Sequence, residues 1–210
     1  MIKKTILCYG DSITWGYDPA KPERMKSNER WTGLLKKGLG ASYTIIEEGL
    51  NGRITIWDDP QYPDCKNGLK YLEPCLNYHK PIDLCILFLG TNDLKKRFSL
   101  SAFEISYGIK VLVEIIQKSG SGPDNTSPKI LLMTPPYLTR ISNAEEFKDS
   151  YNVSYKLPLY YSKIAENYNC EFIDTSKIIV ASKLDGIHPD VGEHLKLAKA
   201  VYKKIKNIMI

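Results

Sequence analysis

The sequence lacks an apolar run long enough to cross a membrane. A membrane-spanning helix needs about 20 apolar residues in succession, whereas the first apolar stretch, Ile6–Tyr9, ends at Gly10-Asp11-Ser12. The same stretch is too short for the apolar region of a signal peptide. We therefore predict a protein with no membrane partner, located in the cytoplasm.

Cysteine is scarce, and its arrangement argues against cross-links. The five cysteines are an odd number and none belongs to a Cys-x-x-Cys pair, so neither a disulfide framework nor a cysteine zinc site is predicted. Cys8 and Cys85 lie in apolar runs typical of strands, where cysteine packs as a small hydrophobic side chain. Free thiols of this kind again favour the cytoplasm.

Patterns that bind phosphate or metal are also missing. Neither GxxxxGK[ST] nor GxGxxG occurs, so no glycine-rich loop that cradles nucleotide phosphates is predicted. A metal site through His188, Asp190 and His194 is the weaker alternative, because this spacing matches no common site. We expect neither a cofactor nor a metal.

Charge of one sign is in only small excess. Lys and Arg number 29 against 24 for Asp and Glu, a net charge of +5, which does not by itself indicate a nucleic-acid partner. The C-terminal lysines, Lys196, Lys199, Lys203, Lys204 and Lys206, are typical of the solvated face of an amphipathic helix. The length predicts one domain, residues 1–210.

Short runs rich in β-forming residues alternate with helical patterns. The runs are Thr5–Tyr9, Tyr43–Ile46, Leu84–Leu89, Ile130–Met133 and Glu171–Ile173. Helices are expected from Trp31 to about Gly40, over Ser101–Lys118, over Pro158–Asn167, and from Asp190 to the end of the chain. The alternation predicts an α/β fold with a parallel sheet. The irregular stretches 18–30, 54–69 and 135–150 are predicted to be long loops, which often build binding sites.

Residues suited to catalysis follow these strands. Ser12 comes directly after the first strand, and ligands of open α/β sheets bind outside the carboxyl ends of the strands. In Asp185-Gly186-Ile187-His188, a short turn could place the carboxylate on the imidazole, which would then serve as the base for Ser12. Each residue also has a plainer interpretation, Ser12 as a helix cap and His188 as a solvated side chain beside a turn.

Two further features fall at the same predicted edge of the sheet. Asn92 could donate N–H bonds to charge that develops on a substrate oxygen, and Gly52 allows its backbone N–H to approach a ligand closely. Both residue types also suit ordinary turns. The convergence of these features with Ser12 and His188 on one edge favours a catalytic site.

In their order along the chain, these blocks resemble those of the SGNH, or GDSL, hydrolase family. The blocks are Gly10-Asp-Ser-Ile13, Gly52, Gly90-Thr-Asn-Asp93 and Asp185-Gly-Ile-His188. The resemblance implies a flavodoxin-like three-layer sandwich around a five-stranded parallel sheet of order 2-1-3-4-5. It also implies Ser12 as nucleophile, His188 as base and Asp185 as its orienting partner, with an oxyanion hole formed by Ser12, Gly52 and Asn92.

Additional segments are similar to the bacterial arylesterase/acyltransferase branch of that family. They are 10–16, 30–33, 46–50, 58–60 and 71–76. This similarity implies a serine esterase for small, short-acyl carboxylic esters that works through an acyl-enzyme, transfers some acyl groups to alcohols and forms homo-oligomers. Trp15 and Asp11 are then expected to bind substrate, and Tyr17, Trp57 and Tyr62 could line the pocket.

Two alternative functions follow from the same residues. A carbohydrate or metabolite O-deacetylase would use the same site. A non-catalytic binding protein with this fold is the alternative from another class, and the presence of Ser12, Asn92, Asp185 and His188 together argues against it.

Overall fold

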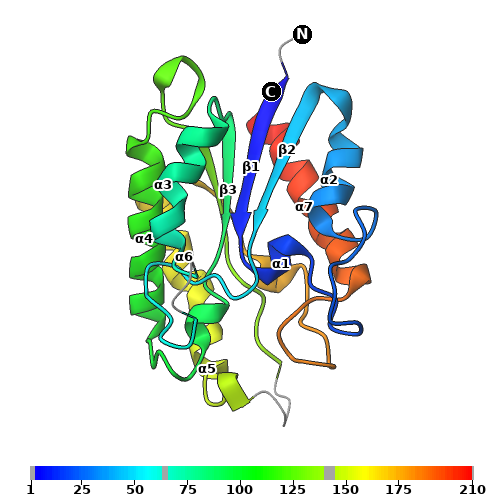
Figure 1. Cartoon of the computed structure of the whole chain (residues 1–210), viewed down its shortest axis with the longest axis vertical. Helices are drawn as coiled ribbons and strands as arrows, with labels where there is room; N and C mark the ends of the chain where they lie inside the picture. The colour runs from blue at the N-terminus through cyan, green and yellow to red at the C-terminus, as the bar shows by residue number, and fades with distance from the viewer. Residues whose placement is uncertain (1–2, 63–65, 140–144, 210) are drawn as a thin grey trace.

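A parallel sheet forms the centre of the protein (Figure 1). The computed structural model describes residues 3–62, 66–139 and 145–209. Its strands are β1 (Lys4–Gly10), β2 (Tyr43–Gly49), β3 (Leu84–Phe88), β4 (Lys129–Met133) and β5 (Glu171–Ile173). They pair in parallel in the order β2-β1-β3-β4-β5. The predicted flavodoxin-like order is confirmed.

The register of the strands brings three strand ends to one place. Gly10, the last residue of β1, pairs with Gly49 of β2 on one side and with Phe88 of β3 on the other. The segments that follow these strands therefore begin side by side. β2 continues beyond its predicted end at Ile46 because its pairing with β1 extends to Gly49.

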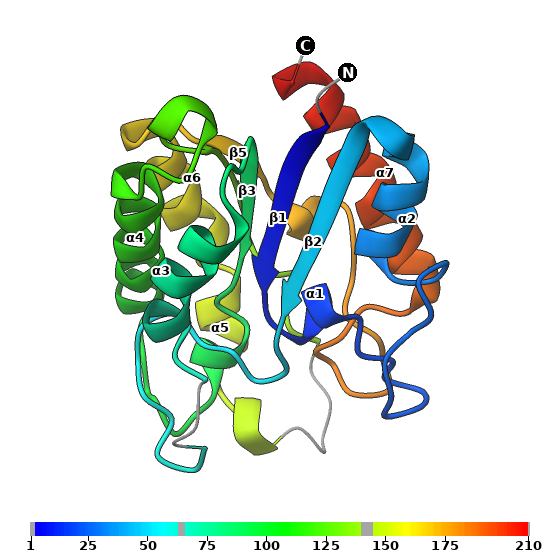
Figure 2. The same ribbon diagram turned by 45° about the horizontal axis from the view of Figure 1, so that its top comes forward.

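Helices cover both faces of the sheet and give the three layers (Figures 1 and 2). One face carries α2 (Trp31–Leu39) and α7 (Val191–Ile208), and the other carries α3 (Gly68–His79), α4 (Ala102–Lys118) and α6 (Leu157–Asn167). The short helices are α1 (Ser12–Trp15) and α5 (Tyr151–Ser154). β1 begins and α7 ends at the end of the sheet away from α1 (Figure 2). Every residue of β3 is buried, as expected for a strand covered on both faces.

Single-turn 3₁₀ segments complete the described structure. They are Gly40–Ser42, Asn92–Leu94, Pro123–Asn125, Glu145–Phe147 and Thr175–Lys177. The peptide bond between Lys80 and Pro81 is cis.

Capping side chains set the starts of two helices. Ser101 and Glu104 form a complete capping box at α4. At α7, Asp190 accepts a hydrogen bond from the backbone N–H of Glu193, but the Glu193 carboxylate accepts from the N–H of Val180 and so does not complete a capping box. The cap of α7 therefore also fixes the segment that leads from β5.

Helix α3 was not predicted from the sequence. Pro74 lies inside it, and proline disfavours a helix interior because it lacks the N–H and crowds the preceding turn. Leu72, Cys75 and Leu76 are nonetheless buried against the sheet. Their spacing gives α3 an apolar stripe whose burial outweighs the local cost of the proline.

The described part of the chain contains no helix that is both long and apolar enough to span a membrane. The lysine-rich side of α7 carries ion pairs within this protein. Lys196 pairs with Glu193 at 2.6 Å, and Lys204 pairs with Glu171 at 2.5 Å. These contacts agree with a solvated amphipathic face.

A buried histidine joins the two helices on one face of the sheet. His194 of α7 is fully buried, and its Nδ1 accepts a hydrogen bond of 3.1 Å from the backbone N–H of Trp31 at the start of α2. Burial, reinforced by the nearby His188, lowers the pKa of His194 from 6.5 to about 4. The folded protein therefore holds this imidazole neutral.

We expect His194 to make the protein less stable in acid. Between pH 6.5 and pH 4 the unfolded chain binds a proton at this residue that the folded protein does not, so the free energy of unfolding falls as the pH falls. At ~1.4 kcal/mol per unit of pKa, the contribution is about 3 kcal/mol. Denaturant titrations of the parent and of His194→Asn from pH 7 to pH 4 measure it.

Asparagine can still accept the Trp31 N–H but does not titrate, so the variant should lose the histidine's share of this pH dependence. Comparing two proteins is necessary because burial raises the pKa of Asp93 to about 6, which makes stability change in the opposite direction over an overlapping pH range. Parallel pH curves for parent and variant would contradict the prediction.

Candidate active site

The sharp turn after β1 presents Ser12. Asp11 is the N-cap of α1, and its carboxylate accepts a 2.9 Å hydrogen bond from the backbone N–H of Ile13. Gly16 ends the helix in the left-handed conformation. Ser12 is thus the first residue of a short, capped helix, and its hydroxyl is held in one place at the edge of the sheet.

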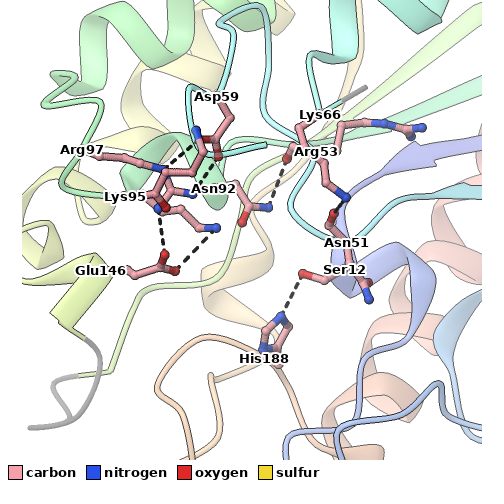
Figure 3. Close-up of polar contacts among 11 residues, drawn as sticks. Ser12, Asn51, Arg53, Asp59, Lys66, Asn92, Lys95, Arg97, Glu146 and His188 are labelled. Carbon is pink, nitrogen blue, oxygen red and sulfur yellow. Dashed lines mark hydrogen bonds and ion pairs between the residues drawn. The ribbon is translucent and has the colours of Figure 1, made fainter. Parts of the chain in front are cut away.

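His188 and Asp185 complete a hydrogen-bonded chain with Ser12. The Nε2 atom of His188 lies 2.8 Å from the Oγ of Ser12 (Figure 3), and its Nδ1 lies 2.6 Å from Oδ2 of Asp185. The other carboxylate oxygen, Oδ1, accepts hydrogen bonds of 2.9 Å from the backbone N–H groups of Ile187 and His188. The sequence-predicted trio is therefore assembled in hydrogen-bonding geometry, although Ser12 and His188 are 176 positions apart.

The surroundings of Asp185 keep its carboxylate ionised. Partial burial by itself would raise the pKa of Asp185, but the hydrogen bond and positive charge of His188 and the two backbone donors lower it below its ordinary value. An ionised carboxylate on Nδ1 keeps the proton there, so Nε2 is free to accept a proton from Ser12.

The ring of Tyr17 covers one face of the His188 imidazole. The two ring centroids are 4.4 Å apart, and Tyr17 follows Gly16 at the end of α1. Tyr17 was considered only as a pocket-lining residue from the sequence. Its contact also restricts the orientation of the base.

The three groups predicted to form an oxyanion hole belong to the segments that follow β1, β2 and β3. Among the described residues, the backbone N–H groups of Ser12 and Gly52 have no hydrogen-bond acceptor. The side-chain amide of Asn92 donates to the carbonyl of Arg53 at 3.1 Å, which leaves its second N–H available. Gly52 has a φ of +79°, a conformation that favours glycine. These groups could together stabilise negative charge on a substrate oxygen.

Arg53 holds the Gly52 turn against the strand ends. It is 3% exposed, and its Nη1 donates to the carbonyl of Gly10 at 3.0 Å and to that of Glu48. Its guanidinium also lies 4.2 Å from the ring centre of Tyr9. Sequence analysis assigned Arg53 no role, because only the fold brings these carbonyl groups to it.

A buried carboxylate fixes the neighbouring loop. Asp93 accepts hydrogen bonds from the backbone N–H of Thr55 at 3.1 Å and from its hydroxyl at 2.5 Å. Burial raises the pKa of Asp93 to about 6. The Gly90–Asp93 block therefore has two tasks, since Asn92 faces the site while Asp93 anchors the loop that follows Gly52.

Two residues expected to bind substrate have different placements. Asp11 is 1% exposed and caps α1, which favours a role in shaping the turn over a direct role with substrate. Trp15 is partly buried, and the guanidinium of Arg24 lies 5.6 Å from its ring centre. Substrate binding by Trp15 stays a prediction.

The other two aromatic candidates lie in the loop after Gly52. Trp57 is partly buried, and Tyr62 is 53% exposed with the guanidinium of Arg97 at 6.0 Å. A pocket wall formed by Trp57 and Tyr62 also stays a prediction. The predicted 135–150 loop extends over residues 140–144, which lie outside the described residues.

The histidine metal site considered as an alternative is not formed. His188 contacts Ser12 and Asp185, Asp190 caps α7, and His194 binds the N–H of Trp31. Within the described ranges, the one group able to offer three metal ligands is Glu48, Cys75 and His79. There, the His79 ring already contacts the Glu48 carboxylate at 2.8 Å, and burial raises the pKa of Cys75 to about 12, which disfavours the thiolate that a metal requires.

The whole arrangement corresponds to one family of hydrolases. Residues 8–194 match the model of the GDSL-like lipase/acylhydrolase family. The chain belongs to this family. It is a serine esterase, and the resemblance predicted from the four sequence blocks is confirmed.

Solved structures of two esterases are similar over nearly the whole chain. An aryl esterase of M. smegmatis, solved with an inhibitor bound, is 36% identical with a TM-score of 0.93, over 98% of this chain and 100% of that one. A carbohydrate acetylesterase from Sinorhizobium meliloti is 34% identical with a TM-score of 0.94, over 99% of this chain and 100% of that one. A comparison with curated proteins gave no significant match.

Proposed function

We propose that the protein hydrolyses esters of short acyl groups through an acyl-enzyme on Ser12, with His188 as the base and Asp185 as its partner. The observation that carries this proposal is the continuous hydrogen-bonded chain from Ser12 Oγ to the Asp185 carboxylate, with steps of 2.8 and 2.6 Å. A nucleophile, a base and an orienting acceptor in this order are what serine catalysis requires.

The reaction follows from this geometry in two halves. Ser12 Oγ attacks the ester carbonyl while its proton moves to Nε2 of His188, and the negative oxygen is stabilised by the N–H groups of Ser12, Gly52 and Asn92. His188 then gives the proton to the leaving alcohol, and the C–O bond of the ester breaks. Water gives a proton to the same imidazole and attacks the acyl-Ser12 ester. The bond between the acyl carbon and Oγ then breaks, His188 returns the proton to Oγ, and the acid is released.

An alcohol can replace water in the second half, and we propose that this chain carries out such acyl transfer as well. The support is the similarity to the arylesterase/acyltransferase branch together with the aromatic side chains near the site. Tyr17 lies on His188, and Trp15 is three residues from Ser12. Aromatic walls favour the carbon chain of an alcohol over ordered water.

A second candidate substrate class is the acetylated carbohydrate. The observation that favours it is the overall likeness to the acetylesterase from Sinorhizobium meliloti, whose name states carbohydrate substrates. Deacetylation would use the same atoms, with a sugar hydroxyl as the leaving group.

One set of assays tests both the acyl transfer and the preference for short acyl groups. With vinyl acetate and benzyl alcohol in buffer, we expect acetate and benzyl acetate to form together from the start, and acetyl esters to be cleaved faster than long-chain esters. The short-chain preference follows if the pocket is small, because each extra methylene must then clash or stay in water. Acetate alone from the start would contradict acyl transfer, and faster cleavage of long-chain esters would contradict the short-acyl preference.

Three broader proposals accompany this function. We propose that residues 1–210 form one esterase domain. The support is the single five-stranded sheet, around which the helices of the described chain pack.

A cytoplasmic location is supported by free thiols at Cys8, Cys75, Cys85 and Cys170. Homo-oligomer formation is supported by exposed apolar side chains on α4 and α6, where Phe103 is 62% and Leu159 is 58% exposed.

A further inference from the structure

A nearly buried ammonium group lies beside the candidate oxyanion hole. Lys95 closes the 3₁₀ turn that begins at Asn92, and its backbone N–H donates to the Asn92 carbonyl at 3.2 Å. In Figure 3 the Lys95 side chain points toward that of Asn92, while His188 approaches Ser12 from another side. The Lys95 side chain is only 11% exposed. A lysine in this position requires an anionic or strongly polar partner.

The described structure gives Lys95 an incomplete partner. Its amine lies 3.6 Å from the Glu146 carboxylate, which is longer than a direct hydrogen bond. Arg97 contacts Glu146 more closely than Lys95 does, because it donates to Oε1 of Glu146 at 2.7 Å. It also donates to both oxygens of Asp59, at 3.1 and 2.7 Å. Glu146 is therefore shared. The Lys95 amine also lies 6.0 Å from the ring centre of Phe147, and it keeps N–H donors that a ligand could satisfy.

Basic side chains lie on both sides of Asn92. Lys66 crosses the Gly52 turn, since a Cβ at Gly52 would lie 3.7 Å from its Cδ and Cε atoms, and its amine donates to the Asn51 carbonyl at 2.8 Å. Lys95 and Arg97 face two carboxylates, those of Asp59 and Glu146, whereas the Lys66 amine lies at Asn51 on the other side of Asn92 (Figure 3). Burial lowers the pKa of Lys95, and the Glu146 charge offsets part of this effect. An anionic group beside Lys95 would share its ammonium with Glu146.

We propose that Lys95 binds a carboxylate carried by the acyl group of the ester, so that the enzyme accepts half-esters of short dicarboxylic acids. The inference rests on the proposed function, because the position of the acyl group follows from the roles of Ser12 and His188. The leaving oxygen must lie within reach of Nε2 of His188, which protonates it. The acyl group then extends toward the side of the site that Lys95 occupies.

Paired substrates with one leaving group test this assignment. Monomethyl succinate carries the carboxylate and methyl butanoate does not, and methanol release reports both reactions. In Lys95→Met, the ratio of kcat/KM for the charged ester to that for the neutral ester should fall about 10- to 100-fold, the loss typical of a hydrogen bond to a charged group. Lys95→Arg should retain most of the preference because it keeps the charge.

Lys96 offers a matched control. It is the neighbouring lysine, it is exposed, and Lys96→Met removes the same charge from the surface, so the ratio should stay within about twofold of the parent, as screened surface charges contribute little. Equal ratios for Lys95→Met and the parent, with both esters still cleaved through Ser12, would overturn the proposal while leaving the esterase function intact. Loss of Ser12-dependent cleavage of every ester would instead contradict the function itself.

Charge on the leaving group provides the second arm. The esters para-acetoxybenzoate and phenyl acetate share the acetyl group and differ in the charge of the alcohol portion. The proposal expects their ratio to be the same in Lys95→Met and the parent. A Lys95-dependent preference for para-acetoxybenzoate would place the anion on the leaving group and overturn the acyl assignment.

Discussion

Replacement of Ser12 by alanine should reduce kcat for para-nitrophenyl acetate by about 10⁴- to 10⁶-fold and leave the fold intact. The alanine lacks the oxygen that would form the acyl-enzyme, so the hydrogen-bonded chain through His188 has nothing to deprotonate. Ser12 makes no other side-chain hydrogen bond among the described residues, and its removal should therefore change the melting temperature little. Steady-state kinetics and thermal unfolding of the purified variant measure both effects.

The double variant Ser12→Ala/His188→Ala gives a sharper test of the same mechanism. Members of a catalytic unit lose activity non-additively, so the double variant should be no more than slightly slower than Ser12→Ala alone. Ser162→Ala is a suitable control, because Ser162 lies on α6 and its hydroxyl donates to the Leu159 carbonyl within the same helix. The control should react with a fluorophosphonate probe like the parent, and Ser12→Ala should not. Near-normal turnover by Ser12→Ala would exclude an acyl-Ser12 intermediate.

The sequence was sufficient to predict the sheet because its strands carry a strong local signal. Leu84–Phe88 is apolar at every position and is buried at every position. The alternation with helices predicts that the strands are parallel, whereas their order was implied by the family resemblance. Helix α3 was missed because Pro74 is a local signal against a helix, whereas the packing of Leu72 and Leu76 that stabilises it exists only in the folded protein.

The candidate site likewise contains residues that the sequence predicted and residues that it did not. Ser12, Asn92, Asp185 and His188 lie in short blocks with a recognisable order, so a resemblance could identify them although each block alone was ambiguous. Arg53 and Lys95 have no such signal. Their significance depends on which carbonyl groups, carboxylates and loops the fold places around them, and sequence spacing does not contain that information.

Replacement of Asp185 by asparagine should lower kcat by about 10⁴-fold. Unlike the Ser12 variant, this variant loses no reacting atom; the loss comes from a change in the tautomer of the His188 imidazole. The asparagine oxygen can still accept the backbone N–H groups of Ile187 and His188, which Oδ1 of Asp185 now binds at 2.9 Å. The loop should therefore keep its shape. The amide NH₂ would instead face Nδ1 of His188, now 2.6 Å from Oδ2, and the imidazole proton would move to Nε2, where it blocks proton transfer from Ser12.

Asp190 provides the control that separates this specific contact from a general effect of negative charge near the base. It lies two residues after His188, but its carboxylate caps α7 by accepting the N–H of Glu193 at 3.1 Å. Asparagine is an equally good N-cap, so Asp190→Asn should retain stability and should change kcat less than about tenfold, since it removes a charge without touching Nδ1. Comparable losses in the two variants would mean that the field of nearby carboxylates, and not the Asp185–His188 hydrogen bond, sets the reactivity of Ser12. A large loss confined to Asp185→Asn, with an unchanged melting temperature, is the result that the 2.6 Å contact predicts.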